Sequence, residues 1–413
     1  MTTAGAHKRV VFVEQYYYPE GWGGAAIPRD ITIYLSTAGY EVEVVCGSDP
    51  YAPMHANDAI ENPAAAGVKI VRIPRLFAGD IKRGRVIRQL WFYAALVPTL
   101  LFRRPPDLYI AQTNPPFAIV LLTCFGRLFR VPLIIIAQDL YPESLIAHGL
   151  IRRGSPTERA LRAAFRWAYC AAAVVVVLGP VMHRRVIEKG VSGARIVEIS
   201  NWATGSMHPP SGSNPLRKAW RLEGRFVLLY SGNLGIGHEF ETLLDAVQLA
   251  VPRCPELRLV FVGKGGRLAE VRAGVALRGL SGFVEFHDFV SASELPYSLS
   301  LADFAVVTLR NGFEGLVVPS KFFGYMARGI PTLYIGPESD VSAFVERTQA
   351  GLVFRTGDAA AIADAIVAAS TDPKWLKRMS AAAHTQYLES FQKDKALSAY
   401  AATVQGIIGG GES

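Results

Sequence analysis

Residues 311 to 331 combine a carboxylate, a hydroxyl and a cation at a spacing that could bind a phosphorylated sugar. They follow an apolar run at 304–308 and lead into a helical pattern, so Glu314, Ser320 and Lys321 are expected where a strand end meets a helix start. Anions bind at such places in α/β sheets, because the backbone amides there are positive. A Glu can hydrogen-bond sugar hydroxyls, and a Lys can neutralise a diphosphate. The segment predicts a nucleotide-sugar site.

Two adjacent glycines offer a second place for a phosphate. Gly23 and Gly24 lie between a predicted first strand, Arg9 to Glu14, and a predicted helix from about Ala25 to Gly39. Without side chains, they let backbone amides approach a phosphate, although a plain tight turn is the alternative. The fingerprint Gly-x-Gly-x-x-Gly is not present after this strand, which argues against an NAD enzyme.

Asp139 is the candidate residue for acid–base chemistry. It follows the apolar run Leu133 to Ala137 and is therefore expected at the carboxyl end of a buried strand. A carboxylate there could orient or deprotonate the hydroxyl of an acceptor. Capping of a helix that starts near Pro142 is the alternative role.

The elements that must position these residues alternate between strand and helix patterns, which predicts α/β domains with doubly wound parallel sheets. The length of 413 residues favours two domains. We predict an acceptor-binding Rossmann-like domain at 1–205, to which a helix at 388–407 crosses back, and a nucleotide-sugar-binding one at 206–387. The predicted strands are Arg9 to Glu14, Val42 to Cys46, Lys69 to Ile73, Leu108 to Gln112, Leu133 to Ala137, Val174 to Leu178, Ile196 to Ser200, Phe226 to Ser231, Leu257 to Gly263, Val284 to Phe286, Phe304 to Thr308, Thr332 to Ile335 and Leu352 to Phe354.

Positive charge is concentrated around one apolar helix pattern. The net charge is +8, and residues 69 to 104 contain nine Lys or Arg against a single acid, Asp80. Within this frame, Leu90 to Phe102 is apolar but shorter than the roughly 20 residues that a bilayer span needs. Such a helix could lie in the interface of an anionic leaflet, and an ordinary buried helix is the alternative.

Composition also bears on the compartment and on other ligand classes. The four cysteines are far apart, which favours a reducing compartment, and the N-terminus lacks the apolar core of a signal peptide, so a cytoplasmic location is expected. The eight His show no metal-ligand spacing, so no metal and no cofactor are predicted. The Arg pairs lack interleaved aromatic residues, and no nucleic-acid partner is predicted.

Over its whole length the chain resembles retaining glycosyltransferases of the GT-B fold, the large family 4 group. It is most similar to the subgroup of bacterial fucosamine and N-acetylhexosamine transferases of surface-polysaccharide synthesis. The resemblance implies two Rossmann-like domains that face each other across a cleft. The residues that carry it are Tyr16 to Gly24, Gln138 to Ser144, Ser200-Asn201-Trp202, Ser231 to Gly235, and Pro319-Ser320-Lys321 leading to Tyr325-Met326-Ala327.

The resemblance implies a role for each matching residue. Catalytic roles fall to Asp139, Lys321 and Glu314, with Glu314 reaching the donor sugar. Donor binding is expected from Gly23, Gly24, Gly232, Asn233, His238, Phe289, Ser320 and Lys321. Acceptor binding is expected from Tyr18, Gln138, Asp139 and Asn201.

Four positions depart from the family pattern. Gln138 precedes Asp139 where the family often has His, and Gly324 stands where many relatives have a second Glu. Asn233 and His238 stand where a diphosphate-gripping Arg and Lys are common. Lys321 thus becomes the main candidate for neutralising the diphosphate.

The expected reaction is transfer of a sugar, with retention, from a nucleotide diphosphate to a glycan acceptor that could be carried on a polyprenyl diphosphate. UDP is favoured over GDP, because the similar subgroup uses N-acetylated amino sugars. Membrane association at the inner leaflet is a hypothesis that follows from the basic apolar helix. A nucleotide-sugar 2-epimerase and a non-catalytic relative that binds a nucleotide sugar or glycan are the alternatives.

Overall fold

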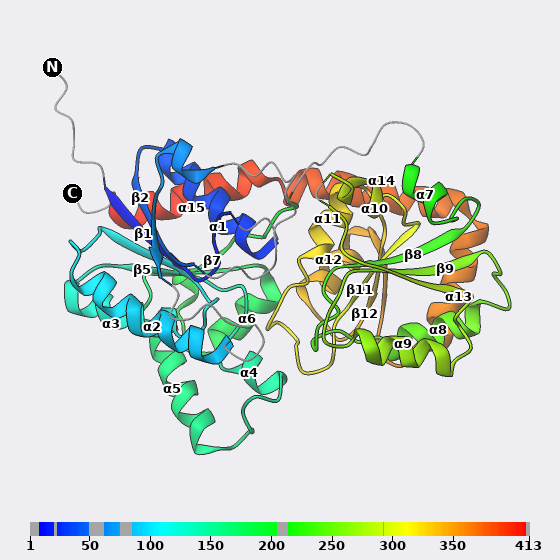
Figure 1. Ribbon diagram of the computed structural model, residues 1–413, viewed down its shortest axis with the longest axis horizontal. Coiled ribbons are helices and arrows are strands. Elements are labelled where there is room, and N and C mark those ends of the chain that lie inside the picture. The colour runs from blue at the N-terminus through cyan, green and yellow to red at the C-terminus, as the bar shows by residue number, and fades with distance from the viewer. Residues whose placement is uncertain are drawn as a thin grey trace. The chain divides into compact units, whose positions relative to one another are not determined.

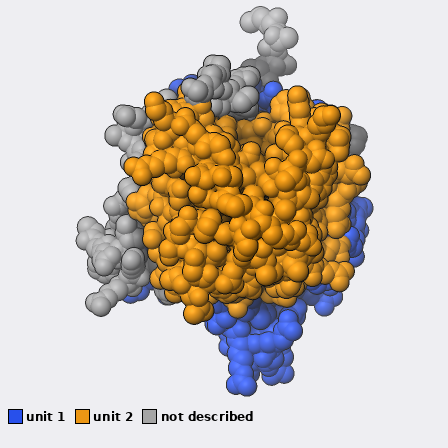
Figure 2. Space-filling view, turned by 90° about the vertical axis from the view of Figure 1, so that its right-hand side faces the viewer, with its two compact units in different colours: residues 1–200, 394–413 blue, residues 201–393 orange. Residues whose placement is uncertain are grey.

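The chain forms two compact units. The structure, a computed structural model, describes residues 8–19, 23–48, 62–74, 85–204, 214–291 and 293–409. Unit 1 comprises residues 1–200 and 394–413, and unit 2 comprises residues 201–393 (Figures 1 and 2). These bounds lie at 200 and 394 where the sequence suggested 205 and 388.

Unit 1 is built on a seven-stranded parallel sheet of order β3-β2-β1-β4-β5-β6-β7. Its central strands are runs of Val, Ile and Leu because both faces of the sheet are covered. The strands are β1 Arg9–Glu14, β2 Glu41–Gly47, β3 Lys69–Ile73, β4 Leu108–Gln112, β5 Leu133–Ile136, β6 Val174–Val177 and β7 Ile196–Glu198.

Helices cover both faces of this sheet. In Figure 1, α1 and α15 lie on one face and α3 and α5 on the other. The Tyr34 hydroxyl, on α1, lies 3.1 Å from the Ser398 hydroxyl, on α15, which ties the C-terminal helix to unit 1. The helices are α1 Gly23–Thr37, α2 Arg85–Leu101, α3 Ala118–Phe129, α4 Glu143–Ala147, α5 Pro156–Ala171, α6 Pro180–Glu188 and α15 Lys393–Ile408, with 3₁₀ turns η1 Pro63–Ala66 and η2 Gly193–Arg195.

Unit 2 repeats the design with a six-stranded parallel sheet of order β10-β9-β8-β11-β12-β13. The strands are β8 Phe226–Ser231, β9 Leu257–Val262, β10 Val284–His287, β11 Phe304–Thr308, β12 Thr332–Ile335 and β13 Gly351–Phe354. The helices are α7 Pro215–Ala219, α8 Glu241–Ala250, α9 Leu268–Leu277, α10 Leu295–Leu299, α11 Lys321–Ala327, α12 Asp340–Thr348, α13 Ala359–Thr371 and α14 Pro373–Ser390.

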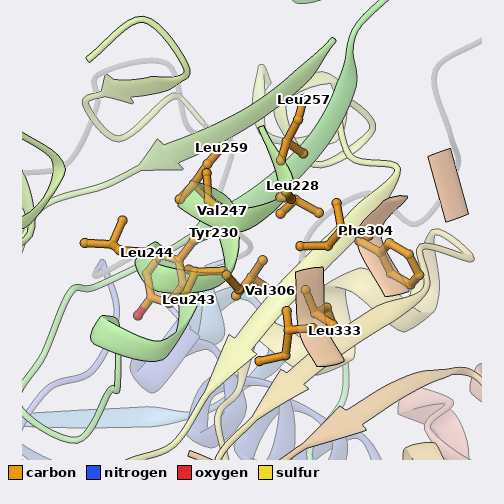
Figure 3. Close-up of a cluster of buried hydrophobic side chains, with 14 of the residues drawn as sticks. Leu228, Tyr230, Leu243, Leu244, Val247, Leu257, Leu259, Phe304, Val306 and Leu333 are labelled. Carbon is orange, nitrogen blue, oxygen red and sulfur yellow. The ribbon is translucent and has the colours of Figure 1, made fainter. Parts of the chain in front are cut away.

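The core of unit 2 lies between its sheet and the layer formed by α8, α9 and α13 (Figure 1). Leu228 and Tyr230 of β8 point into the same cluster as Leu243 and Val247 of α8 (Figure 3). All four side chains are fully buried, so the carboxyl end of β8 is held rigidly. The site described below begins at that strand end.

Helix α2 is the predicted apolar helix, and much of its apolar surface is solvent-exposed. The exposed fraction is 62% for Leu90 and 47% for Leu101, and it reaches 84% for Phe102 directly after the helix. The other face is anchored, because the Trp91 indole N–H donates to the Pro74 carbonyl at 2.8 Å. Among the described residues, no helix is both long and apolar enough to cross a membrane.

The helix is also tied to the sheet by charge. Arg103, just beyond α2, lies 2.5 Å from the carboxylate of Glu43 on β2. Arg9 and Lys69 contact the same carboxylate, at 3.1 and 3.3 Å. These cations offset the burial of the carboxylate and hold the pKa of Glu43 below its ordinary value. The apolar helix is therefore fixed at its C-terminal end.

Candidate functional site

The ammonium of Lys321, the first residue of α11, is buried. Its Nζ lies 3.4 Å from the centroid of the Tyr230 ring. Within the described part of the chain, this Nζ has no hydrogen-bond partner, and burial lowers the pKa of Lys321 well below its ordinary value. The amine is therefore not a solvated surface group. A buried cation without a counterion is a favourable place for an anion to bind.

Glycine backbone forms the wall beside this ammonium. A Cβ on Gly232, directly after β8, would lie 3.3 Å from Cε of Lys321. Gly263, directly after β9, has φ of +139°, and a Cβ there would lie 2.2 Å from the Gly232 carbonyl oxygen. Only glycine fits such an approach of two backbones. The two strand ends thus approach each other and Lys321 so closely that no side chain fits at Gly263.

The Tyr325 hydroxyl fixes the last residue of β8. It accepts a hydrogen bond from the Ser231 N–H at 2.8 Å and donates to the Ser231 carbonyl at 3.3 Å. Tyr325 lies on α11, the helix that carries Lys321. The hydroxyl therefore sets the position of α11, and with it the ammonium, relative to the strand end.

His238 lies close to the ammonium but is uncharged. Its Nδ1 donates to the Thr308 carbonyl at the end of β11, at 2.8 Å. Burial, followed by the charge of Lys321, lowers the pKa of His238 to about 3. His238 is therefore neutral at physiological pH and does not provide a second cation for a diphosphate. A hydrogen-bonding role in donor binding stays a prediction.

The other residues predicted on unit 2 lie in the same loops. Asn233 and Ser320 are solvent-exposed. The exposed fraction of Phe289, two residues beyond β10, is 50%. Both carboxylate oxygens of Glu314 accept from the Gly312 N–H, at 2.9 and 3.0 Å. Glu314 thus stabilises its own loop, and its contact with a donor sugar stays a prediction.

On unit 1, Asp139 lies beyond the carboxyl end of β5 and is partly exposed. The backbone N–H groups of Gln138 and Asp139 both donate to the Thr113 hydroxyl, at 3.1 and 3.0 Å. Burial raises the pKa of Asp139 to about 6, and the charge of His148 opposes that rise. The N-cap of α4 is Pro142, without a side-chain hydrogen bond, so the capping role is wrong.

The remaining residues predicted on unit 1 follow the same edge of its sheet. Gly23 and Gly24 are the first residues of α1, and Tyr18 lies in the turn after β1. Asn201, which was predicted on the same domain, is buried and is the first residue of unit 2. The carboxyl ends of parallel strands share one edge, so Tyr18, Gly23 and Gly24 belong to the same side of unit 1 as Asp139.

Sequence reasoning missed several residues that hold these groups in place. Tyr230 carries the face on which the ammonium lies, and Thr113 fixes the turn that leads to Asp139. Lys189 binds the far end of that turn. Tyr325 was visible as part of a motif, but the others are ordinary strand and helix residues without a sequence signal. Among the described residues, no group of three or more His, Cys, Asp or Glu is arranged to hold a metal ion.

The family models and relatives that match this chain are all described as glycosyltransferases. Residues 23–202 match the model of the glycosyl transferase 4-like domain, and residues 225–372 match that of the glycosyl transferases group 1. WbjE of Pseudomonas aeruginosa, named as a glycosyltransferase, is 27% identical over 63% of this chain and 65% of its own length. WcaI of Escherichia coli (strain K12), named as a glycosyl transferase of colanic acid biosynthesis, is 25% identical over 76% of this chain and 79% of its own.

Solved structures agree on the architecture. The crystal structure of Anabaena HepE (Alr3699) in complex with UDP has a TM-score of 0.72 and 17% identity, over 96% of this chain and 100% of that one. WaaG, described as a glycosyltransferase involved in lipopolysaccharide biosynthesis, has a TM-score of 0.66 and 15% identity, over 96% and 100%. Each unit of this chain is thus one of the two parallel-sheet domains of a GT-B fold.

Proposed function

Because the chain joins a glycosyl transferase 4-like domain to a domain of the glycosyl transferases group 1 family, we propose that it transfers a sugar from a nucleoside diphosphate to a glycan hydroxyl. UDP is the favoured nucleotide, since HepE has been crystallised with UDP and with UDP-glucose. A hexosyl or N-acetylhexosaminyl group fits the family resemblance. The similarity to WbjE and WcaI supports a role in surface-polysaccharide synthesis.

The buried ammonium of Lys321, which has no hydrogen-bond partner among the described residues, is the observation that supports donor binding on unit 2. It lies at the carboxyl edge of a parallel sheet, beside the glycine backbone of residue 232. A diphosphate would supply the missing counter-charge, and neutral His238 would leave Lys321 as the main cation. The site would then stabilise the charge that develops on the leaving diphosphate.

The chemical step needs no residue to bond with the sugar. The bond from the anomeric carbon to the diphosphate oxygen breaks, and a bond from that carbon to the acceptor oxygen forms on the same face. The acceptor proton passes to the leaving phosphate oxygen, so the configuration is retained. We assign to Asp139 the orientation of the acceptor hydroxyl, because its carboxyl lies at the corresponding edge of unit 1 and titrates near neutral pH.

Calorimetric titration of the wild-type protein with UDP, GDP, dTDP and CDP tests the donor site. We expect one of the four, UDP by this proposal, to bind at least tenfold more tightly than the others. Failure of all four to bind would remove the donor site and favour a non-catalytic relative. Acceptor-dependent release of the nucleotide then separates a transferase from a 2-epimerase, which needs no acceptor.

We further propose that the exposed face of α2 lies on an anionic membrane, where an acceptor carried on a polyprenyl diphosphate would be found. The apolar side chains Ile87, Leu90, Val97, Leu101 and Phe102 are all more than a third exposed. Arg88 lies between Ile87 and Leu90, and Arg104 follows shortly after Phe102. Apolar burial and attraction to anionic lipid headgroups would then act together.

Leu90→Glu is expected to lower binding to vesicles of phosphatidylglycerol and phosphatidylcholine by about tenfold. The substitution would place a negative charge on the face of α2 that the membrane would cover. Co-sedimentation at two salt concentrations measures it. The matched control is Leu277→Glu, which places the same charge at another exposed leucine, on α9 of unit 2. Equal losses in both variants, or no binding by the wild type, would contradict the proposal.

A further inference from the structure

The turn that carries Asp139 is held at its far end by one buried lysine. Lys189, the C-cap residue of α6, has a side chain that is only 10% exposed. Its Nζ donates to the Tyr141 carbonyl at 3.0 Å and to the carboxylate of Glu143. One ammonium thus binds the backbone two residues after Asp139 and the side chain that begins α4.

The near end of the turn is held independently. The Thr113 hydroxyl accepts the N–H groups of Gln138 and Asp139, so Asp139 lies between two anchors, one on each side. The Tyr141 ring is stacked on the fully buried Phe165, with centroids 5.7 Å apart. Lys189 is the charged part of the second anchor, and a buried ammonium with two acceptors is bound more strongly than neutral donors would be.

We propose that Lys189 is a positioning residue for the acceptor site, which fixes the turn at 138–143 and so holds the Asp139 carboxyl in its half-buried place. This inference rests on the role that the proposed function gives to Asp139. Lys189 contacts neither the reacting groups nor the donor site. It acts through the Tyr141 carbonyl and Glu143.

Substitution of a neighbouring arginine, Arg162, tests whether an effect of Lys189→Met comes from movement of the turn or only from the loss of a positive charge. Arg162 binds the other carboxylate oxygen of Glu143, at 3.1 Å, and also Glu158, at 2.7 Å. Neither of these two contacts involves the Tyr141 backbone. Arg162→Met therefore removes one cation from Glu143 and leaves the turn tied to Lys189.

The test is the pKa of Asp139, followed by ¹³C NMR in protein labelled at the aspartate carboxyl carbons and assigned with Asp139→Asn. In the wild type we expect about 6. In Lys189→Met the released turn lets water reach the carboxyl, and the pKa should fall by at least half a unit. Lys189→Arg should keep the wild-type value, because a guanidinium can still donate to both acceptors.

The direction of the change decides the outcome. Loss of a positive charge without movement of the turn would raise the pKa of Asp139, as it would for any carboxyl near a removed cation. A rise, or no change, in Lys189→Met would therefore overturn the inference. So would a fall of the same size in Arg162→Met.

The proposed function can fail separately from this inference. If Asp139→Asn leaves acceptor-dependent nucleotide release unchanged, the role of Asp139 is wrong, whatever Lys189 does to its pKa. If Asp139→Asn abolishes release while Lys189→Met shifts neither the pKa nor the release, only the role of Lys189 is wrong. Circular dichroism and thermal unfolding of each variant show whether it is folded.

Discussion

Lys321→Met is expected to weaken UDP binding by about 100-fold or more, because a diphosphate would lose its main buried counter-charge. The methionine has a similar length and keeps the contact with the Tyr230 ring, so packing changes little. Calorimetric titration of both proteins measures the loss. Lys374→Met is the control, since Lys374 is an exposed lysine of α14 in the same unit. Unchanged affinity in Lys321→Met would exclude this ammonium from the donor site.

The same substitution is expected to stabilise the protein when no nucleotide is present. The Nζ of Lys321 has no hydrogen-bond partner among the described residues. Replacing such a buried charge with an apolar group removes the desolvation cost of the charge from the free energy of folding. A gain of about 1–4 kcal/mol would be typical of such replacements. Thermal unfolding without ligand measures it. Loss of both stability and binding would instead indicate that the variant is damaged.

The stability difference should also depend on pH in a fixed direction. The pKa of Lys321 is lowered in the folded protein, so below the ordinary lysine pKa of about 10.4 the unfolded chain binds more protons than the folded one. The folded wild type therefore gains stability as pH rises through this window. The advantage of Lys321→Met should shrink from pH 7 towards pH 10, and a constant advantage would show that the amine is not buried in solution.

Asp139→Asn is expected to lower acceptor-dependent release of the nucleotide by about 10² to 10⁴-fold, the range for a lost general base or orienting carboxylate. UDP affinity should stay within twofold, because Lys321, the main cation proposed for the donor diphosphate, lies on unit 2. Glu188→Gln is the control, since Glu188 is an exposed carboxylate on α6 of the same unit. A variant with full transfer activity would remove Asp139 from the reaction.

The pH profile gives a second measure of the same residue. The pKa of Asp139 is raised to about 6 by burial, so the ionised carboxylate forms as pH rises through 6, and the transfer rate should rise with it. His148 opposes that rise, so His148→Gln should move the midpoint of the profile to higher pH. Asp139→Asn should lack this limb of the profile.

The predicted strands all match strands of the structure within two residues at either end. Buried parallel strands leave a strong signal, because both faces are covered and the whole run is apolar, as in Leu133 to Ile136 and Val174 to Val177. Glycine and proline mark the ends of these runs, so their borders were readable too. The GT-B expectation followed from this alternation and from the motifs together.

The roles of the charged residues were much harder to predict from the sequence than the positions of the strands. The helical pattern before Tyr325 placed Lys321 at a helix start, but no local signal showed that the Tyr230 ring would lie under the ammonium. The adjacent Gln138 and Asp139 predicted a strand end, but not the Thr113 hydroxyl that binds both of their amides. The sequence allowed His238 as a cation. Only its burial and the charge of Lys321 make it neutral, although the hydrogen bond from its ring to the Thr308 carbonyl acts in the opposite direction.

The sequence by itself determined two parallel-sheet units and the strand ends at which Asp139 and Lys321 lie. Strand position follows from short-range patterns of apolar residues, which a sequence displays directly. Only the tertiary structure decided that the Lys321 amine is buried, that His238 is neutral and that Lys189 holds the Asp139 turn. Burial and the choice of hydrogen-bond partner depend on residues far apart in the chain, and these set the charge of each group.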